Sequence, residues 1–130
     1  MTLISRRSVI ALTACLHSAA LLTACGWTGD TGSVKKATDL AIECRTDEAL
    51  VALDQAREGG GLGKYLSYLE RVGILRDAGR MAEADKALEA YMALPEAASS
   101  DPAEVEKSIQ EFIDKLRKER KEQTGSPACP

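Results

Sequence analysis

The stretch Leu75-Arg76-Asp77-Ala78-Gly79-Arg80-Met81-Ala82-Glu83-Ala84 predicts a tight turn between two helices, and it decides the fold. Apolar residues recur every three or four positions before Ala78-Gly79 and again after it, which is the spacing of a helix with one buried face. Pro95 ends the second helix. The first helix, about 62–77, is expected to bury Leu62, Tyr65, Leu66, Leu69, Val72 and Leu75, and the second Ala84, Ala87, Leu88, Tyr91 and Leu94.

The preceding segment repeats this pattern. A shift of 35 residues aligns Glu48-Ala49 with Glu83-Ala84, and the same shift aligns Leu40 with Leu75 and Leu53 with Leu88. Helices are therefore expected at about 33–44 and 47–58, with Gly59-Gly60-Gly61 as the turn between the two pairs. The sequence predicts an all-α fold of two antiparallel helical hairpins.

A fifth helix is predicted after the hairpins. Asp101-Pro102-Ala103-Glu104 places a capping residue, a first-turn proline and a glutamate in the order of a capping box. The expected inward face carries Val105, Ile109, Phe112 and Leu116. The run from Lys115 to Glu122 alternates in charge, so we expect it to be a solvated helix surface.

The repeated hairpin resembles the tetratricopeptide repeat, in which an αα-hairpin recurs at about 34 residues. The Gly-Arg and Glu-Ala pairs of residues 79–84 carry the similarity, with Ala84 where the helices must approach closely. The resemblance covers residues 33–95 and implies that the fifth helix is a C-terminal capping helix. Lys36, Arg71, Tyr91 and Pro95 depart from the pattern, and an unrelated helical bundle is the alternative.

The same resemblance implies a binding surface. In this family the first helix of each hairpin lines a concave groove that holds a protein or peptide partner. By that resemblance the candidate groove positions are Thr38, Ala41, Ile42, Leu69, Gly73 and Arg76.

The N-terminus has the features of an export signal. Arg6-Arg7 precede a mostly apolar run that ends at Leu22, and no Asp or Glu occurs before residue 25. Leu22-Thr23-Ala24-Cys25 resembles a bacterial lipobox, which implies that residues 1–24 are removed and that Cys25 is lipidated. The similar string ending at Cys15 follows an apolar region of only about four residues, too short for a signal, so Cys25 is favoured.

Residues 25–32 are expected to form a lipidated, Gly-rich tether. Gly26 follows the lipidated position and, by resemblance to Gram-negative lipoproteins, favours the periplasmic face of the outer membrane. Trp27 either sits at the bilayer interface or folds back on the domain. Whether export uses the general or the twin-arginine route stays open, since Arg6-Arg7 resembles the latter signal only in part.

The helical domain is expected to span residues 33–123, and residues 124–130 form a tail. Cys44 and Cys129 are the two cysteines that remain beyond Cys25, and an exported protein meets an oxidising compartment. A disulfide between them is predicted, and two free thiols are the alternative.

Composition excludes several classes of chemistry. His17 is the only histidine and lies in the predicted signal, so the mature chain has no imidazole for acid–base catalysis or metal binding. The net charge of −3 argues against nucleic acid as a partner. The run Gly59–Lys64 lacks the spacing of a phosphate-binding loop and has Tyr65 where Ser or Thr is needed. We therefore expect that the chain is not an enzyme and that it binds no cofactor or metal.

Two functions remain. The first is a membrane-anchored lipoprotein whose tetratricopeptide-like domain binds a protein of the cell envelope, as an adaptor or assembly factor. The second is a purely structural helical subunit of an envelope complex. The oligomeric state, the partner and the envelope type stay undecided.

Overall fold

The structure is a computed structural model and describes residues 30–130. The predicted signal peptide, Cys25, Gly26 and Trp27 lie outside these residues. The described chain is all-helical, without strands, which confirms the expected fold class. Its elements are α1 (Thr31–Ile42), α2 (Thr46–Glu58), α3 (Gly61–Asp77), α4 (Met81–Met92), the short 3₁₀ helix η1 (Pro95–Ala97) and α5 (Pro102–Thr124).

α1 starts and ends two residues earlier than expected. Asp30 caps the helix, with its carboxylate accepting a hydrogen bond from the Ser33 amide at 2.9 Å. At the other end Cys44 adopts a positive φ of 63°, which ends the helix. The predicted tether of residues 25–32 therefore includes the first two residues of α1.

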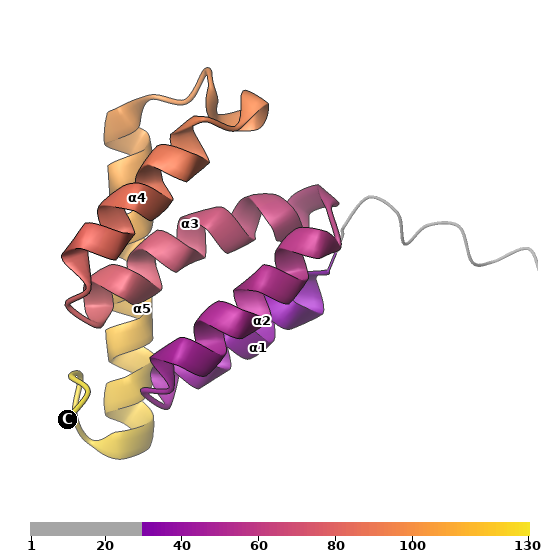
Figure 1. Cartoon of the computed structure of the whole chain (residues 1–130). Helices are drawn as coiled ribbons and strands as arrows, with labels where there is room; N and C mark the ends of the chain where they lie inside the picture. Colours follow the sequence, from indigo (N-terminus) through magenta and orange to yellow (C-terminus); the bar gives the residue numbers. More distant parts are fainter. Residues whose placement is uncertain (1–29) are drawn as a thin grey trace, which may run out of the picture.

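The first four helices pack as two pairs, α1 with α2 and α3 with α4, and α2 also lies against α3 (Figure 1). Ala49 and Ala84 are both fully buried where the paired helices approach each other. Their small side chains allow the close packing that the sequence predicted at these positions.

The turns inside the two pairs have the same hydrogen bonds. The Arg45 amide donates to the Leu40 carbonyl at 2.9 Å, and the Arg80 amide donates to the Leu75 carbonyl at 2.8 Å. Both turns also contain a residue with positive φ, Cys44 in the first and Gly79 in the second. Each turn is thus closed by a bond from the second residue past the C-cap, as in a Schellman motif.

α2 and α4 begin without a side-chain cap. Arg45 and Arg80 occupy the N-cap positions, and neither makes a capping hydrogen bond. Instead each guanidinium forms two bonds to a glutamate three residues later, Glu48 in the first turn and Glu83 in the second.

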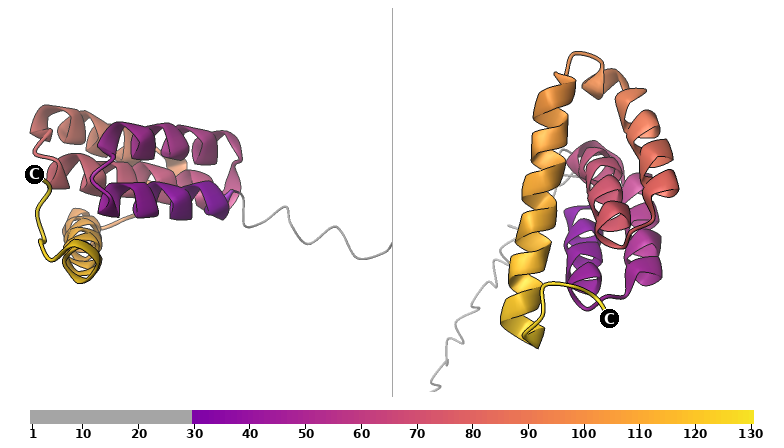
Figure 2. Two further views of the ribbon diagram at one scale, coloured as in Figure 1. Left: turned by 90° about the horizontal axis from the view of Figure 1, so that it is seen from below. Right: turned by 90° about the vertical axis from the view of Figure 1, so that its left-hand side faces the viewer.

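α5 packs on the two pairs and runs across them (Figure 2). Its contacts fall mainly on α3 and α1, and it barely touches α4. α5 therefore packs on the first helix of each pair, and the capping role that the resemblance implies stays a prediction.

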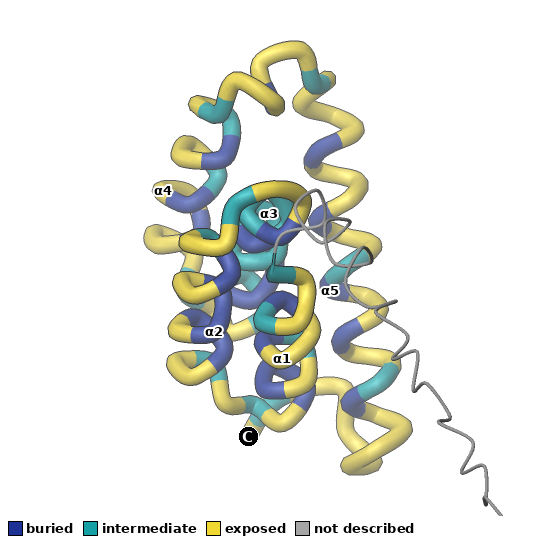
Figure 3. Tube along the Cα trace, turned by 90° about the vertical axis from the view of Figure 1, so that its right-hand side faces the viewer, coloured by how far each residue is buried: buried dark blue, intermediate teal, exposed yellow. Residues whose placement is uncertain are grey.

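The core fills the space between α1–α4 and the inner side of α5, whose outer side is exposed (Figure 3). Most predicted inward residues are buried or packed against this core. Leu62 is an exception, with 48% of its surface exposed. It lies in the first turn of α3, next to a surface hollow rather than a neighbouring helix.

Candidate functional site

The six predicted groove positions lie on one face, formed by α1 and α3, and this face is covered by α5. Ala41 and Ile42 are only 3% and 2% exposed, and Gly73 is buried as well. The other three, Thr38, Leu69 and Arg76, are partly buried. The prediction of an open partner groove at these positions is therefore corrected, because the chain's own helix occupies it.

The centre of this contact is formed by Gly73 of α3 and Phe112 of α5. A Cβ atom built on Gly73 would collide with the Phe112 ring. A glycine at this point lets the aromatic ring lie directly on the α3 backbone. Near the start of α5, Glu106 forms an ion pair with Arg76 at 2.5 Å.

A buried charge cluster joins the end of α5 to the ends of α1 and α3. Arg120 is 2% exposed, and its guanidinium binds the Asp77 carboxylate at 2.6 Å. It also donates to the carbonyls of Ala41 at 2.9 Å and Ile42 at 3.2 Å. Arg117 binds the other Asp77 oxygen at 2.8 Å. The cluster supplies additional donors to two carbonyls at the C-terminal end of α1.

The expectation that Lys115–Glu122 is entirely solvated is wrong at Arg120. The inward stripe of α5 includes Ile109, Ile113 and Leu116, and one more turn of the same spacing reaches Arg120. Continuing the stripe past the apolar residues would have indicated that this arginine faces inward. No such signal marks Asp77 as its partner, because that pairing depends on how α5 crosses α3.

The C-terminal tail is held at the α1–α2 turn. Cys44 and Cys129 form a disulfide, with Cα atoms 5.6 Å apart. Arg120 adds a hydrogen bond to the Pro127 carbonyl at 2.8 Å. The tail, the end of α5 and the first turn therefore form one cross-linked unit.

A partly buried carboxyl group lies between α1 and α3, on the side that α5 covers. The Thr38 hydroxyl donates to Glu70 at 3.0 Å. Burial raises the pKa of Glu70 to about 7, against the opposing effects of the Thr38 hydrogen bond and of Lys115 on α5. Thr38 thus takes part in internal packing rather than facing a partner.

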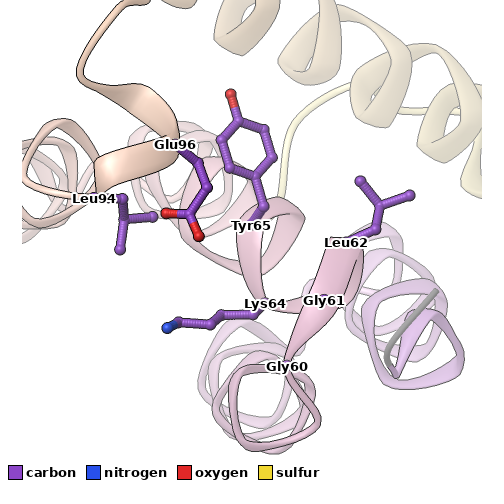
Figure 4. A pocket seen from close by; sticks show the side chains of 7 residues that line it. All are labelled: Gly60, Gly61, Leu62, Lys64, Tyr65, Leu94 and Glu96. Atoms are coloured by element: carbon purple, nitrogen blue, oxygen red, sulfur yellow. The ribbon is translucent and has the colours of Figure 1, made fainter. Parts of the chain in front are cut away.

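A surface hollow with a volume of about 730 Å³ lies at the start of α3. We call it the α2–α3 hollow (Figure 4). Its lining residues are Gly60, Gly61, Leu62, Lys64, Tyr65, Leu94 and Glu96. The lining is mostly apolar, and the volume lies within the range of about 300–1,000 Å³ that is usual for ligand sites.

Tyr65, which lines this hollow, also contacts Tyr91 of α4. The Tyr65 and Tyr91 hydroxyls are hydrogen-bonded, and their rings lie 5.2 Å apart between centroids. Burial, followed by the bond to Tyr65, raises the pKa of Tyr91 to about 12. Tyr91 departs from the small residue of the tetratricopeptide pattern because its ring fills space between α3 and α4.

Two further properties of the described residues concern metal binding and the crossing of a membrane. Among residues 30–130, no group of three or more His, Cys, Asp or Glu side chains is placed to bind a metal ion. In the same part of the chain, no helix has both the length and the apolar character needed to cross a bilayer.

Comparisons with protein-family models, curated proteins and solved structures find no significant match for this chain.

Proposed function

We propose that this chain is a lipoprotein of the bacterial cell envelope, anchored through Cys25, whose helical domain binds another envelope protein as an adaptor or assembly factor. The lipobox-like string and the preceding signal support the anchor. The observation that carries the proposal is the disulfide between Cys44 and Cys129, because such bonds persist in oxidising compartments outside the cytoplasm.

A tetratricopeptide-like arrangement of the two helix pairs is part of this proposal. It is supported by the matching turns, which have the same closing hydrogen bonds and the same arginine–glutamate pairs at a separation of 35 residues. Because α5 covers the α1–α3 face, the partner binds elsewhere. The exposed apolar residues Val51 on α2 and Met81 on α4, at 57% and 53% exposure, lie on the helices that α5 leaves open.

The alternative is a purely structural subunit of an envelope complex. One observation favours it. The α1–α3 face, which was expected to bind a partner that exchanges, is covered by α5 of the same chain. An adaptor is expected to exchange its partner, whereas a structural subunit co-purifies with its neighbour in fixed proportion. A pulse-chase measurement of partner exchange in membranes separates the two.

The anchor is tested by the intact mass of the protein extracted from membranes of a bacterial host. We expect a mature species that begins at Cys25 and carries acyl chains, and a Cys25→Ser variant that is neither cleaved at that site nor acylated. A mature chain beginning at Gly26, or at an unmodified Cys25, would contradict the proposal.

The binding surface is tested with a photo-crosslinking residue placed at Val51 or at Met81. We expect one discrete adduct from these positions in intact cells. The matched control is Lys118, which is exposed on the outer side of α5. An adduct from Lys118 alone would place the partner on α5 instead.

A further inference from the structure

The chain enters the described domain beside the α2–α3 hollow. Asp30 lies against Gly59 and Gly63, on either side of the α2–α3 turn. A Cβ atom on Gly63 would come within 2.8 Å of the Asp30 backbone, and one on Gly59 within 2.7 Å of the Asp30 Cβ. Both glycines are therefore needed to hold Asp30 at this place. The turn residues between them, Gly60, Gly61 and Leu62, line the hollow.

The hollow has the chemistry of a site for one aromatic side chain. Leu62, Tyr65 and Leu94 provide apolar and aromatic surface, while Lys64 and Glu96 are polar groups at its margin (Figure 4). Leu62 is one of three large apolar side chains that remain exposed in the described domain. A carboxylate such as Glu96 can accept a hydrogen bond from an indole N–H, and a lysine can lie over an indole face.

The segment that precedes Asp30 contains such a side chain. Trp27 is the only tryptophan of the chain and stands three residues before Asp30. Three residues reach at most about 10 Å, so Trp27 cannot travel far from the α2–α3 turn. A buried indole removes about 150–250 Å² from water, which favours the nearest apolar hollow over solvent.

We propose that the α2–α3 hollow is the binding site for the Trp27 indole, which packs against Leu62 and Tyr65 and fastens the N-terminal segment to the domain. This inference decides between the two positions that the sequence leaves open for Trp27, the bilayer interface and the domain surface. It goes beyond the proposed function and does not depend on lipidation of Cys25.

The single tryptophan provides the measurement. The protein is purified in detergent and then placed in vesicles whose lipids carry brominated acyl chains, which quench an indole inside the bilayer. We expect blue-shifted indole emission, weak quenching by acrylamide and no quenching by the brominated lipids. Strong quenching by the brominated lipids would place Trp27 in the bilayer, and strong quenching by acrylamide would place it in water. Either result would overturn the proposal.

The variant Leu62→Glu tests the hollow itself. α3 has no acidic residue in its first turn, so a glutamate there is compatible with the helix dipole and the fold is expected to survive. We expect red-shifted emission and a several-fold rise in acrylamide quenching. The matched control Val51→Glu changes an equally exposed apolar residue on α2 and should leave both signals unchanged. Protection that survives in Leu62→Glu would show that the indole lies elsewhere.

Discussion

The α1–α2 turn and the α3–α4 turn have the same backbone conformation, but only the first is cross-linked to another part of the chain. In the second, Gly79 holds the positive φ, and a Cβ atom there would meet nothing within 4 Å. In the first, Cys44 holds the same kind of conformation and carries a disulfide to the tail. Left-handed backbone favours glycine, so a cysteine at this point indicates that the cross-link matters more to the fold than local strain.

The largest expected effect comes from breaking that cross-link. Replacing Cys44 and Cys129 by serine opens a loop that spans a sequence separation of 85 residues. We expect the free energy of unfolding to fall by about 4 kcal/mol, since the disulfide restricts the unfolded chain. Urea unfolding of both proteins measures the difference. Thiol counting before and after reduction is the control, and two reactive thiols before reduction would show that no disulfide forms.

The next effect concerns Arg120, the second group that binds the tail to the first turn. Arg120→Met removes a guanidinium that is 2% exposed and leaves Asp77, whose side chain is 6% exposed, with Arg117 as its cation. We expect a loss of about 3 kcal/mol, because the Asp77 carboxylate and two helix-end carbonyls lose buried donors. The matched control Arg117→Met changes a half-exposed partner of the same carboxylate and should cost less than about 1 kcal/mol. Equal losses in the two variants would contradict this assignment.

Arg120 also illustrates what the sequence could not predict. Helix positions followed from apolar spacing, and three of the four connections between the α-helices from Gly, Pro and capping residues, because those signals are local. The crossing of α5 over α1 and α3 is not local. Periodicity predicts which side of α5 is buried but not which helices it contacts. The sequence therefore did not indicate that α5 covers the predicted groove on α1 and α3.

A second difference between the helix pairs lies along their first helices. Thr38 and Gly73 stand 35 residues apart, yet Thr38 binds Glu70 whereas Gly73 makes room for Phe112. The pKa of Glu70 is raised from 4.5 to about 7, so the folded state holds its proton more tightly than the unfolded state does. This contribution to stability is fully present below pH 4.5 and is lost as the pH rises through about 7.

The variant Glu70→Gln removes this titration. Water still reaches Glu70 in part, so we expect the variant to be more stable than the original by only about 1–2 kcal/mol at pH 8. At pH 4 the difference should vanish, because the Glu70 carboxyl group is then protonated and as neutral as the glutamine amide. Thermal unfolding at the two pH values measures this. A constant difference between them would show that Glu70 does not titrate in this range.

The smallest effect returns to the two turns. In the background of Cys129→Ser, Cys44→Gly should be about 1 kcal/mol more stable than Cys44→Ser, because glycine adopts the positive φ of this turn without strain. The reciprocal change, Gly79→Ser, should cost about the same amount, since space is free around Gly79 and only the backbone conformation opposes a side chain. Urea unfolding of the two Cys44 variants, of Gly79→Ser and of the original protein measures both differences. If both changes are neutral, the two turns relax freely, and the cross-link rather than the backbone sets the difference between them.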